Sequence, residues 1–298
     1  MLEEQLSRLV RQQAMSWLDR RPTEQVDYQW LTTFSFEDQP IPLMDRQRGI
    51  RKPASMTAAL SMRTVYTRPD AMPPYADAEG ADGFLRYKYR GDDPEHPENV
   101  ALRRAFHDGL PLIWFVGVPG AVYQPIYPVW IVGDEPEQLQ FIVALDEAQR
   151  LVGAEPTVEL RAYVERLNKV RLHQPMFRAR VLQAYATRCA VCALRHGELL
   201  DAAHIIADGM PHGDPVVPNG LSLCKIHHGA FDQNILGIRQ DLMINIRRDV
   251  LEEIDGPMLR HGLQEMDGQR LVALPRARDA QPDRERLEER YAEFLRAG

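Results

Sequence analysis

The most informative segment of the chain is RCAVCALRHGELLDAAHIIADGMPHGDPVVPNGLSLCKIHHGAFDQNILG, residues 188–237. It holds all three cysteines of the chain, Cys189, Cys192 and Cys224. Cys189-x-x-Cys192 and Cys224-x-x-His227 form two ligand pairs, and a tight turn in each pair brings both donor atoms onto one tetrahedral ion. The sequence therefore predicts a structural Zn²⁺ with three sulfur ligands and one nitrogen ligand. The alternative, three buried free cysteines beside a surface histidine, is disfavoured because every cysteine has the correct spacing.

Four further polar residues of this segment remain once the zinc ligands are assigned: His204, Asn219, His228 and Asp232. The apolar run 202–206 predicts a strand, a Pro- and Gly-rich loop leads to Asn219, and the stretch 224–233 predicts a helix. On that helix His228 and Asp232 are four residues apart, so they share one face and could share a cation. His227 lies about 100° round the helix from His228, so the two histidines can face different sites.

This β-loop-β-α pattern resembles the HNH endonucleases, the ββα-metal nucleases. The resemblance rests on three ordered motifs, AAHI (202–205), PNGLSLC (218–224) and HHGAFD (227–232). It implies that His204 is the general base that takes a proton from the attacking water, and that Asn219 holds the loop and orients this histidine. It also implies that His228 and Asp232 bind a catalytic divalent metal such as Mg²⁺ or Mn²⁺.

One position departs from the family pattern. Many HNH nucleases place an acid or a histidine directly before the general base as a further metal ligand, and this chain has Ala203 there. Asp201 lies on the same strand face as Ala203, because side chains alternate along a strand with a period of two. We therefore expect Asp201 to reach the catalytic metal from one step further along the strand. A hydrogen bond to a turn, or a cap at the end of the strand, is the alternative.

The segment from about 24 to 150 has a different texture, with short β-rich runs such as 111–116, 127–132 and 139–145 and one predicted helix around 97–107. Its motifs resemble the SRA domain, which binds DNA and flips a modified cytosine into a pocket. The motifs are AALSM (58–62), YADAEGADGFLRYKYRG (75–91), ENVALRRA (98–105), GLPLIWF (109–115) and YQPIYPVWIV (123–132).

A flipped base needs aromatic faces for stacking and an acid or amide that reads its edge. Tyr75, Tyr87 and Tyr89 are the expected stacking residues, and Asp77 is the expected acceptor for the cytosine amino group. The alternative for Tyr87 and Tyr89, which alternate in sequence, is that they line one face of a strand.

Charge is unevenly distributed along the chain. The 298 residues hold 36 Lys plus Arg and 43 Asp plus Glu, a formal net charge of −7, which argues against a uniformly basic coat for nucleic acid. From Arg161 to Arg195, however, the sequence carries eight basic residues and one acid, Glu165. A solvated helix face is one explanation, but its position next to the cysteine–histidine segment favours contact with phosphates.

Composition also limits where the protein works. An odd number of cysteines with metal-ligand spacing favours a reducing compartment. The N-terminus lacks the pattern of a signal peptide, and four prolines interrupt the uncharged run 109–132, which argues against a membrane helix. We therefore expect a cytoplasmic protein with no membrane partner.

The predicted fold class is α+β, with an SRA-like (PUA-like) β-barrel domain, a helical linker and a zinc-stabilised ββα-metal domain. The predicted segments are an N-terminal helix (1–22), an SRA-like modified-DNA-binding domain (23–152), a basic helical linker (153–187), an HNH endonuclease domain (188–248) and an acidic extension with a terminal helix (249–298).

Together the two resemblances imply a type IV-like restriction endonuclease that reads 5-methyl- or 5-hydroxymethylcytosine in double-stranded DNA and hydrolyses phosphodiester bonds. One HNH site cuts one strand, so a double-strand break favours a homodimer, with repeated nicking as the alternative. Two rival hypotheses stay open. One is an HNH nuclease whose front domain reads unmodified nucleic acid, including RNA. The other is a non-catalytic zinc module that binds nucleic acid.

Overall fold

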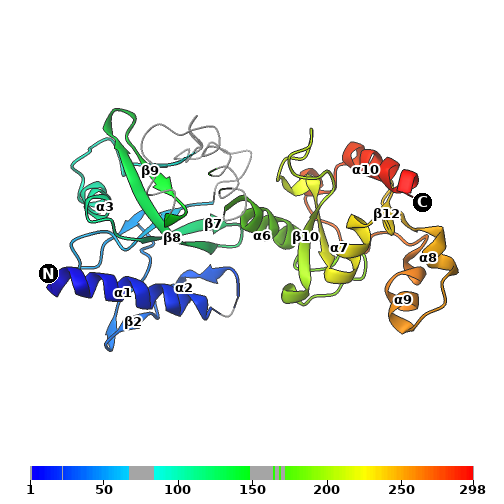
Figure 1. Cartoon of the computed structure of the whole chain (residues 1–298), viewed down its shortest axis with the longest axis horizontal. Coiled ribbons are helices and arrows are strands. Elements are labelled where there is room, and N and C mark those ends of the chain that lie inside the picture. Colours follow the sequence, from blue (N-terminus) through cyan, green and yellow to red (C-terminus); the bar gives the residue numbers. More distant parts are fainter. Residues whose placement is uncertain are drawn as a thin grey trace. The chain divides into compact units, whose positions relative to one another are not determined.

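The computed structural model describes residues 2–21, 23–66, 84–147, 164, 168 and 172–297. The chain divides into two compact units, Met1–Pro175 and Met176–Gly298 (Figure 1). Both contain helices and strands, so the predicted α+β class is confirmed. None of the described helices is long and apolar enough to cross a membrane.

A curled sheet forms the centre of the N-terminal unit. Among the described residues its strand order is β4-β5-β7-β8-β9-β6, with β1 paired to β8. β5 and β7 run parallel, and the other pairs are antiparallel. The strands are β1 (Val26–Asp27), β4 (Ile50–Arg51), β5 (Ser61–Thr64), β6 (Leu85–Lys88), β7 (Leu112–Val118), β8 (Val122–Glu135) and β9 (Gln140–Ala144). A separate hairpin joins β2 (Ser35–Phe36) to β3 (Gln39–Pro40).

Helix α1 (Leu2–Asp19) packs on this sheet because its apolar residues recur on one face. Val10, Ala14 and Leu18 are buried in one core with Ile113 and Phe115 of β7, and Figure 1 shows α1 running along that side of the unit. Other helical elements among the described residues of the unit include α2 (Tyr28–Leu31), α3 (Pro97–His107) and the 3-10 turn η1 (Pro136–Gln138). The predicted helices at 1–22 and around 97–107 are thus confirmed as α1 and α3, and the three predicted strands as β7, β8 and β9.

The expected SRA-like barrel is not shown. β4 and β6 end the strand order, and the described residues contain no pairing between them. Side chains nevertheless draw the two ends together: the Tyr87 hydroxyl of β6 lies 3.1 Å from the carbonyl oxygens of both Gly49 and Arg63. The described sheet is therefore curled rather than closed by backbone hydrogen bonds.

The C-terminal unit contains a ββα arrangement followed by a second hairpin and a terminal helix. Its core joins α6 to the hairpins and to α7, with Phe177, Leu200, Leu221 and Phe231 buried. Its helices are α6 (Gln174–Ala184), which begins two residues before the boundary, α7 (Lys225–Asp232), α8 (Arg248–Glu252), α9 (Pro257–Gly262) and α10 (Arg284–Ala297). Its strands are β10 (Leu200–His204), β11 (Gly220–Cys224), β12 (Leu236–Ile238) and β13 (Ile244–Ile246). The 3-10 turns are η3 (Gly197–Leu199), η4 (Val217–Asn219), η5 (Gln264–Met266) and η6 (Arg278–Ala280).

Helix α10, predicted from the sequence, holds the second hairpin and the end of α7. A Cβ at Gly237 of β12 would lie 2.5 Å from the Phe294 ring, so only glycine allows this approach. The Arg290 guanidinium donates to the carbonyl oxygen of Phe231 at 2.6 Å and lies over the Phe231 ring. The acidic extension therefore belongs to the packed core of the C-terminal unit.

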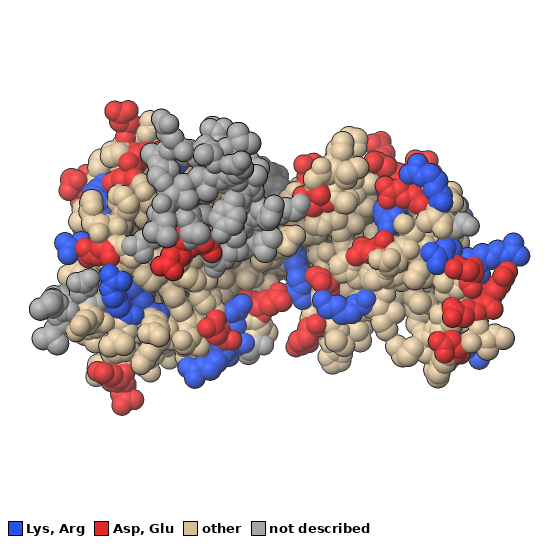
Figure 2. Space-filling model, in the orientation of Figure 1, with Lys and Arg blue, Asp and Glu red and all other residues tan. Residues whose placement is uncertain are grey.

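Charges of both signs are mixed over the surface. Figure 2 shows acidic and basic side chains interspersed over both units on the face that it presents. Many form short-range pairs, such as Arg248 with Glu252 and Arg260 with Glu265. Cations without such partners are therefore the ones of interest for binding an anion.

Candidate active site and metal centre

Two strands and a helix position the predicted site. β10 and β11 pair antiparallel, with Leu200 opposite Cys224 and His204 opposite Gly220. α7 follows directly, with Cys224 as its N-cap residue. The predicted β-loop-β-α order is confirmed, and it puts His204 at the end of the first strand, just before the loop.

The four predicted zinc ligands converge. The Sγ atoms of Cys189, Cys192 and Cys224 and one ring nitrogen of His227 all lie within 4.8 Å of one another. The Nδ1 atom of His227 is 3.4 Å from Cys189 Sγ and 3.1 Å from Cys224 Sγ. Among the described residues this is the one group of three or more His, Cys, Asp or Glu donors that converges so closely. Three sulfurs and one nitrogen are the donors that a structural zinc takes.

The surroundings prepare this cluster for a metal. The Nε2–H of His227 donates to the Gly262 carbonyl at 2.8 Å, which leaves Nδ1 directed at the sulfurs. Hydrogen bonds from Cys189 and Cys192 lower the pKa of the Cys224 thiol, while hydrogen bonds to Cys189 and Cys224 raise that of Cys192. A divalent metal would displace the thiol protons, because it binds cysteine as the thiolate. The donor set and its support fit the predicted zinc.

His204 faces α6. Its imidazole stacks on the Phe177 ring, with 3.9 Å between the centroids and 18° between the planes. Opposite His204, a Cβ at Gly220 would lie 2.4 Å from Val181 and 3.0 Å from Phe177, so glycine at this position lets α6 come close. The helix therefore fixes the ring plane of His204.

Asn219 is fully buried and holds the loop that follows His204. Its Oδ1 accepts from the Ile206 N–H at 2.9 Å. Its Nδ2 donates to the carbonyl oxygens of Ile206 and Asp214 at 3.0 and 3.1 Å. The backbone carbonyl of Asn219 also accepts from Ile205 at 2.9 Å. These bonds fix the chain immediately after His204.

His228 lies between two carboxylates. Its Nε2 is 3.3 Å from Asp232, one turn further along α7, and its Nδ1 is 3.9 Å from Asp201 of β10. His228 is half-buried and Asp232 is exposed, so this side of α7 is open to solvent. Nitrogen and carboxylate oxygen suit the divalent metals that an HNH nuclease uses. His228 and Asp232 thus fit the predicted metal-binding pair.

Asp201 reaches the same neighbourhood, but other cations already bind it. One carboxylate oxygen accepts from Lys225 at 2.9 Å, and the other lies 3.3 Å from the Arg178 Nε. Burial raises the pKa of Asp201, but the hydrogen bond from Lys225, together with that from the Ala202 backbone, outweighs it and the pKa is lowered. Ala203, the position that departs from the family pattern, is buried in the core.

Two of the four predicted base-pocket residues are described, and both are core residues. Tyr87 and Tyr89 are 5% and 2% exposed. Tyr89 donates to Asp134, accepts from Arg103 at 3.2 Å and packs on the Phe141 ring at 4.6 Å. The Tyr87 hydroxyl donates to the carbonyl oxygens at the other end of the sheet, as described above. Tyr75 and Asp77 lie outside the described residues.

Sequence reasoning missed three residues that support this site: Phe177, Arg178 and Lys225. The helical spacing of Phe177 and Val181 placed them on one face, which was a usable signal that α6 packs on the hairpin. Arg178 is one of the eight basic residues between Arg161 and Arg195 for which the sequence favours phosphate contact. In the structure it binds Asp201 and the carbonyl oxygens of Gly197 and Leu200. No sequence pattern links it to a strand more than 20 residues away.

A comparison with protein families supports the resemblance of the cysteine–histidine segment to HNH endonucleases. A family model described as HNH endonuclease, HNH_2, matches residues 189–239. The match runs from the first zinc ligand to just beyond β12, so this segment is an HNH endonuclease domain. No curated protein matches the chain.

Two solved structures share weak similarity with the chain. One is titled "Modification dependent TagI restriction endonuclease", with 19% identity, a TM-score of 0.31 and coverage of 84% of this chain and 86% of that one. The other is described as the type IV phosphorothioation-dependent restriction endonuclease ScoMcrA, with 13% identity, a TM-score of 0.22 and coverage of 84% and 60%. At these scores neither structure determines what this chain does.

Proposed function

We propose that the protein is a metal-dependent DNA endonuclease whose C-terminal unit hydrolyses phosphodiester bonds with His204 as the general base. The observation that carries this proposal is the ββα arrangement of the HNH domain. It puts a histidine at the end of the first strand and a histidine–aspartate pair on the following helix.

The residues divide the work as follows. His204, held in plane by Phe177 and followed by the loop that Asn219 fixes, takes the proton from the attacking water; a histidine suits this step because it titrates near neutral pH. His228 through Nε2 and Asp232 would hold the divalent metal. When bound, this metal neutralises charge that develops on the phosphate and on the departing 3′ oxygen. Cys189, Cys192, Cys224 and His227 would hold the structural zinc that pins the start of α7.

We assign Asp201 to orientation of His228 rather than to the metal. Arg178 and Lys225 occupy its oxygens, and two cations beside a carboxylate disfavour a third. From the Nδ1 side of His228, Asp201 would favour the tautomer whose Nε2 lone pair faces a metal, as carboxylates do behind many metal-binding histidines. This role differs from the metal ligand expected from the sequence.

For the substrate, we propose double-stranded DNA that contains 5-methyl- or 5-hydroxymethylcytosine, read by the N-terminal unit. The support is the ordered series of SRA-like motifs between residues 58 and 132. Tyr75 and Asp77 would contact a flipped base by stacking and by accepting from its amino group. Tyr87 and Tyr89, which are buried, would stabilise the core of the N-terminal unit rather than stack on the base. Since one HNH site cuts one strand, we propose that two copies act together at a double-strand break.

Digestion of one plasmid prepared in unmodified, 5-methylated and 5-hydroxymethylated forms tests this function. With Mg²⁺ or Mn²⁺ present, we expect cleavage of at least one modified form and little cleavage of the unmodified form. Removal of the divalent metal by a chelator that leaves the structural zinc in place should stop the reaction. Equal cleavage of all three forms would retain the nuclease and contradict modified-base reading. No cleavage of any form with any divalent metal would contradict the nuclease itself.

A further inference from the structure

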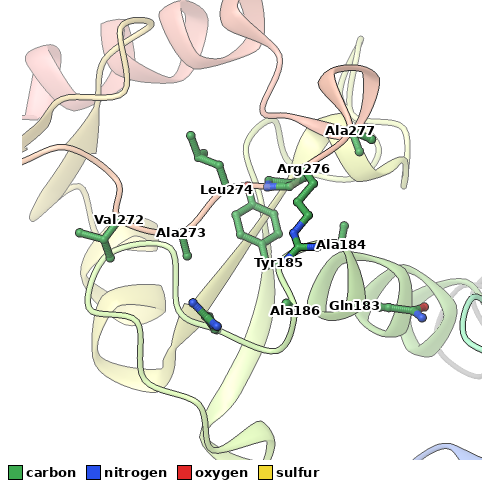
Figure 3. A pocket seen from close by; sticks show the side chains of 12 residues that line it. Gln183, Ala184, Tyr185, Ala186, Val272, Ala273, Leu274, Arg276 and Ala277 are labelled. Atoms are coloured by element: carbon green, nitrogen blue, oxygen red, sulfur yellow. The ribbon is translucent and has the colours of Figure 1, made fainter.

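The C-terminal unit contains a pocket of about 550 Å³ at the C-terminal end of α6. Its walls come from the end of α6 and from the segment 272–280 of the acidic extension. Figure 3 shows Tyr185 and Leu274 at the centre of the hollow, with the Arg276 side chain extending toward Ala184 at the end of the helix. Val272, Leu274 and Pro275 give it an apolar wall.

Two arginines supply all the charge in the lining. Arg188 and Arg276 both line the pocket, and none of the lining residues is acidic. Neither guanidinium has a hydrogen-bond or ion-pair partner among the described residues, whereas Arg248 and Arg260 of the same unit are both paired with acids. Two arginines that line one pocket with no acidic lining residue suit an anion with several oxygens.

Backbone hydrogen bonds anchor the two segments that carry these arginines. Arg188 directly precedes the zinc ligand Cys189, and the next residue, Ala190, donates to the Ser222 carbonyl of β11 at 2.7 Å. The segment that carries Arg276 is attached to the same turn, because the Val272 N–H donates to the Ala190 carbonyl at 2.8 Å. The zinc-binding turn therefore brings together two arginines that are far apart in sequence.

The pocket adjoins the β10–β11 hairpin, which carries His204. The Tyr185 hydroxyl in its wall donates to the Gly220 carbonyl at 3.1 Å, and Gly220 pairs with His204. Phe177, which stacks on His204, precedes the first pocket residue, Gln183, by six positions on α6, or about 9 Å at 1.5 Å per residue. A DNA strand carries a phosphate about every 3.4 Å along its axis, so a strand cut at His204 has further phosphates within this distance.

We propose that this pocket binds the sugar–phosphate backbone of the DNA strand that is cut. Arg188 and Arg276 contact phosphates that flank the scissile one, and the apolar wall packs against deoxyribose. The inference rests on the proposed function, since it takes DNA as the substrate. It also separates the roles of the basic residues between Arg161 and Arg195. Arg188 binds the DNA backbone together with Arg276 of the acidic extension, whereas Arg178 binds Asp201.

Salt-dependent DNA binding by the full chain tests the proposal. All variants carry His204→Ala, so that they bind DNA without cutting it. In Arg188→Ala/Arg276→Ala, the slope of log K against log salt concentration should become less negative by about 1.8, because each lost phosphate contact removes about 0.9. The pair Arg248→Ala/Arg260→Ala removes the same charge from the same unit and should leave the slope near its parent value. Arg188→Lys/Arg276→Lys should restore most of the slope, and zinc content measured in each variant shows whether the turn still folds.

The outcomes separate this inference from the proposed function. If the otherwise native chain cuts DNA and the pocket variant keeps the parent slope, the pocket inference fails alone. An equal loss of slope in the Arg248/Arg260 control would show a general charge effect and also overturn it. If Arg188→Ala/Arg276→Ala loses binding of inorganic phosphate but keeps the parent salt slope for DNA, the pocket binds a free anion and not DNA. If the native chain neither binds nor cuts any duplex, both the proposed function and the inference fail.

Discussion

Two adjacent histidines of α7, His227 and His228, face two different candidate metal sites. His227 points its Nδ1 at the cysteine sulfurs, and His228 lies between Asp201 and Asp232. Adjacent residues of a helix point about 100° apart, so one short helix can serve both sites. The two sites should therefore respond separately to substitution.

Cys192→Ser should lower zinc content and thermal stability together, because a structural zinc contributes its binding free energy to folding. His228→Ala should leave zinc near one per chain while abolishing the dependence of cleavage on an added divalent metal. Metal analysis of the purified variants and thermal melts measure both effects. Equal zinc loss in the two variants would show that the histidines are divided wrongly.

The sequence predicted the zinc set and the strand–helix order because both follow from local spacing. Cys189-x-x-Cys192 and Cys224-x-x-His227 fix donor positions within single turns, whatever the rest of the chain does. The contacts around Asp201 and the burial of the tyrosines could not be predicted in this way. That Arg178 and Lys225 bind Asp201, and that Tyr87 and Tyr89 are buried, depends on contacts between distant segments, which no local pattern encodes.

Among the helices and strands, the packing of α6 on the β10–β11 hairpin holds His204, the proposed general base. The hairpin offers Gly220 directly opposite His204, and α6 fills that space with Val181 and Phe177. A methyl group added there has no room, and crowding a packed core costs about 1–3 kcal/mol. The same change on the exposed face of α7 has ample room, since a Cβ at Gly229 would meet no atom within 4 Å.

Gly220→Ala should therefore lower the free energy of unfolding by about 1–3 kcal/mol and reduce cleavage, because α6 can no longer support the His204 ring. Gly229→Ala should raise the free energy of unfolding by about 0.5–1 kcal/mol, since alanine favours the helix over glycine. Chemical denaturation of both variants measures the two changes. Similar destabilisation by both would mean that α6 does not pack closely on Gly220.

At the scale of the whole molecule, the two compact units have separate cores. One core joins α1 to the sheet, and the other joins α6, the two hairpins and the zinc-binding turn. The four proposed zinc ligands all belong to the C-terminal unit. Loss of the metal should therefore weaken one core and leave the other intact.

Calorimetry of the full chain should show two unfolding transitions, with zinc removal by a strong chelator lowering the midpoint of one of them. The transition that stays unchanged should be the one that Arg11→Met lowers, because Arg11 joins α1 to the N-terminal sheet through the carbonyl oxygens of Ala59 and Pro111. A single transition that chelation and Arg11→Met both lower as a whole would show that the two units unfold together.

Single-turnover cleavage by His204→Ala tests whether the HNH domain cuts DNA with His204 as the general base. We expect DNA binding and zinc content to stay near the levels of the native chain while the cleavage rate falls by about 10²–10⁴-fold, the contribution of a positioned general base. His261→Ala, which removes an exposed histidine of the same unit, should cut at the native rate. Cleavage by the folded, DNA-bound His204→Ala protein at the native rate would contradict the account.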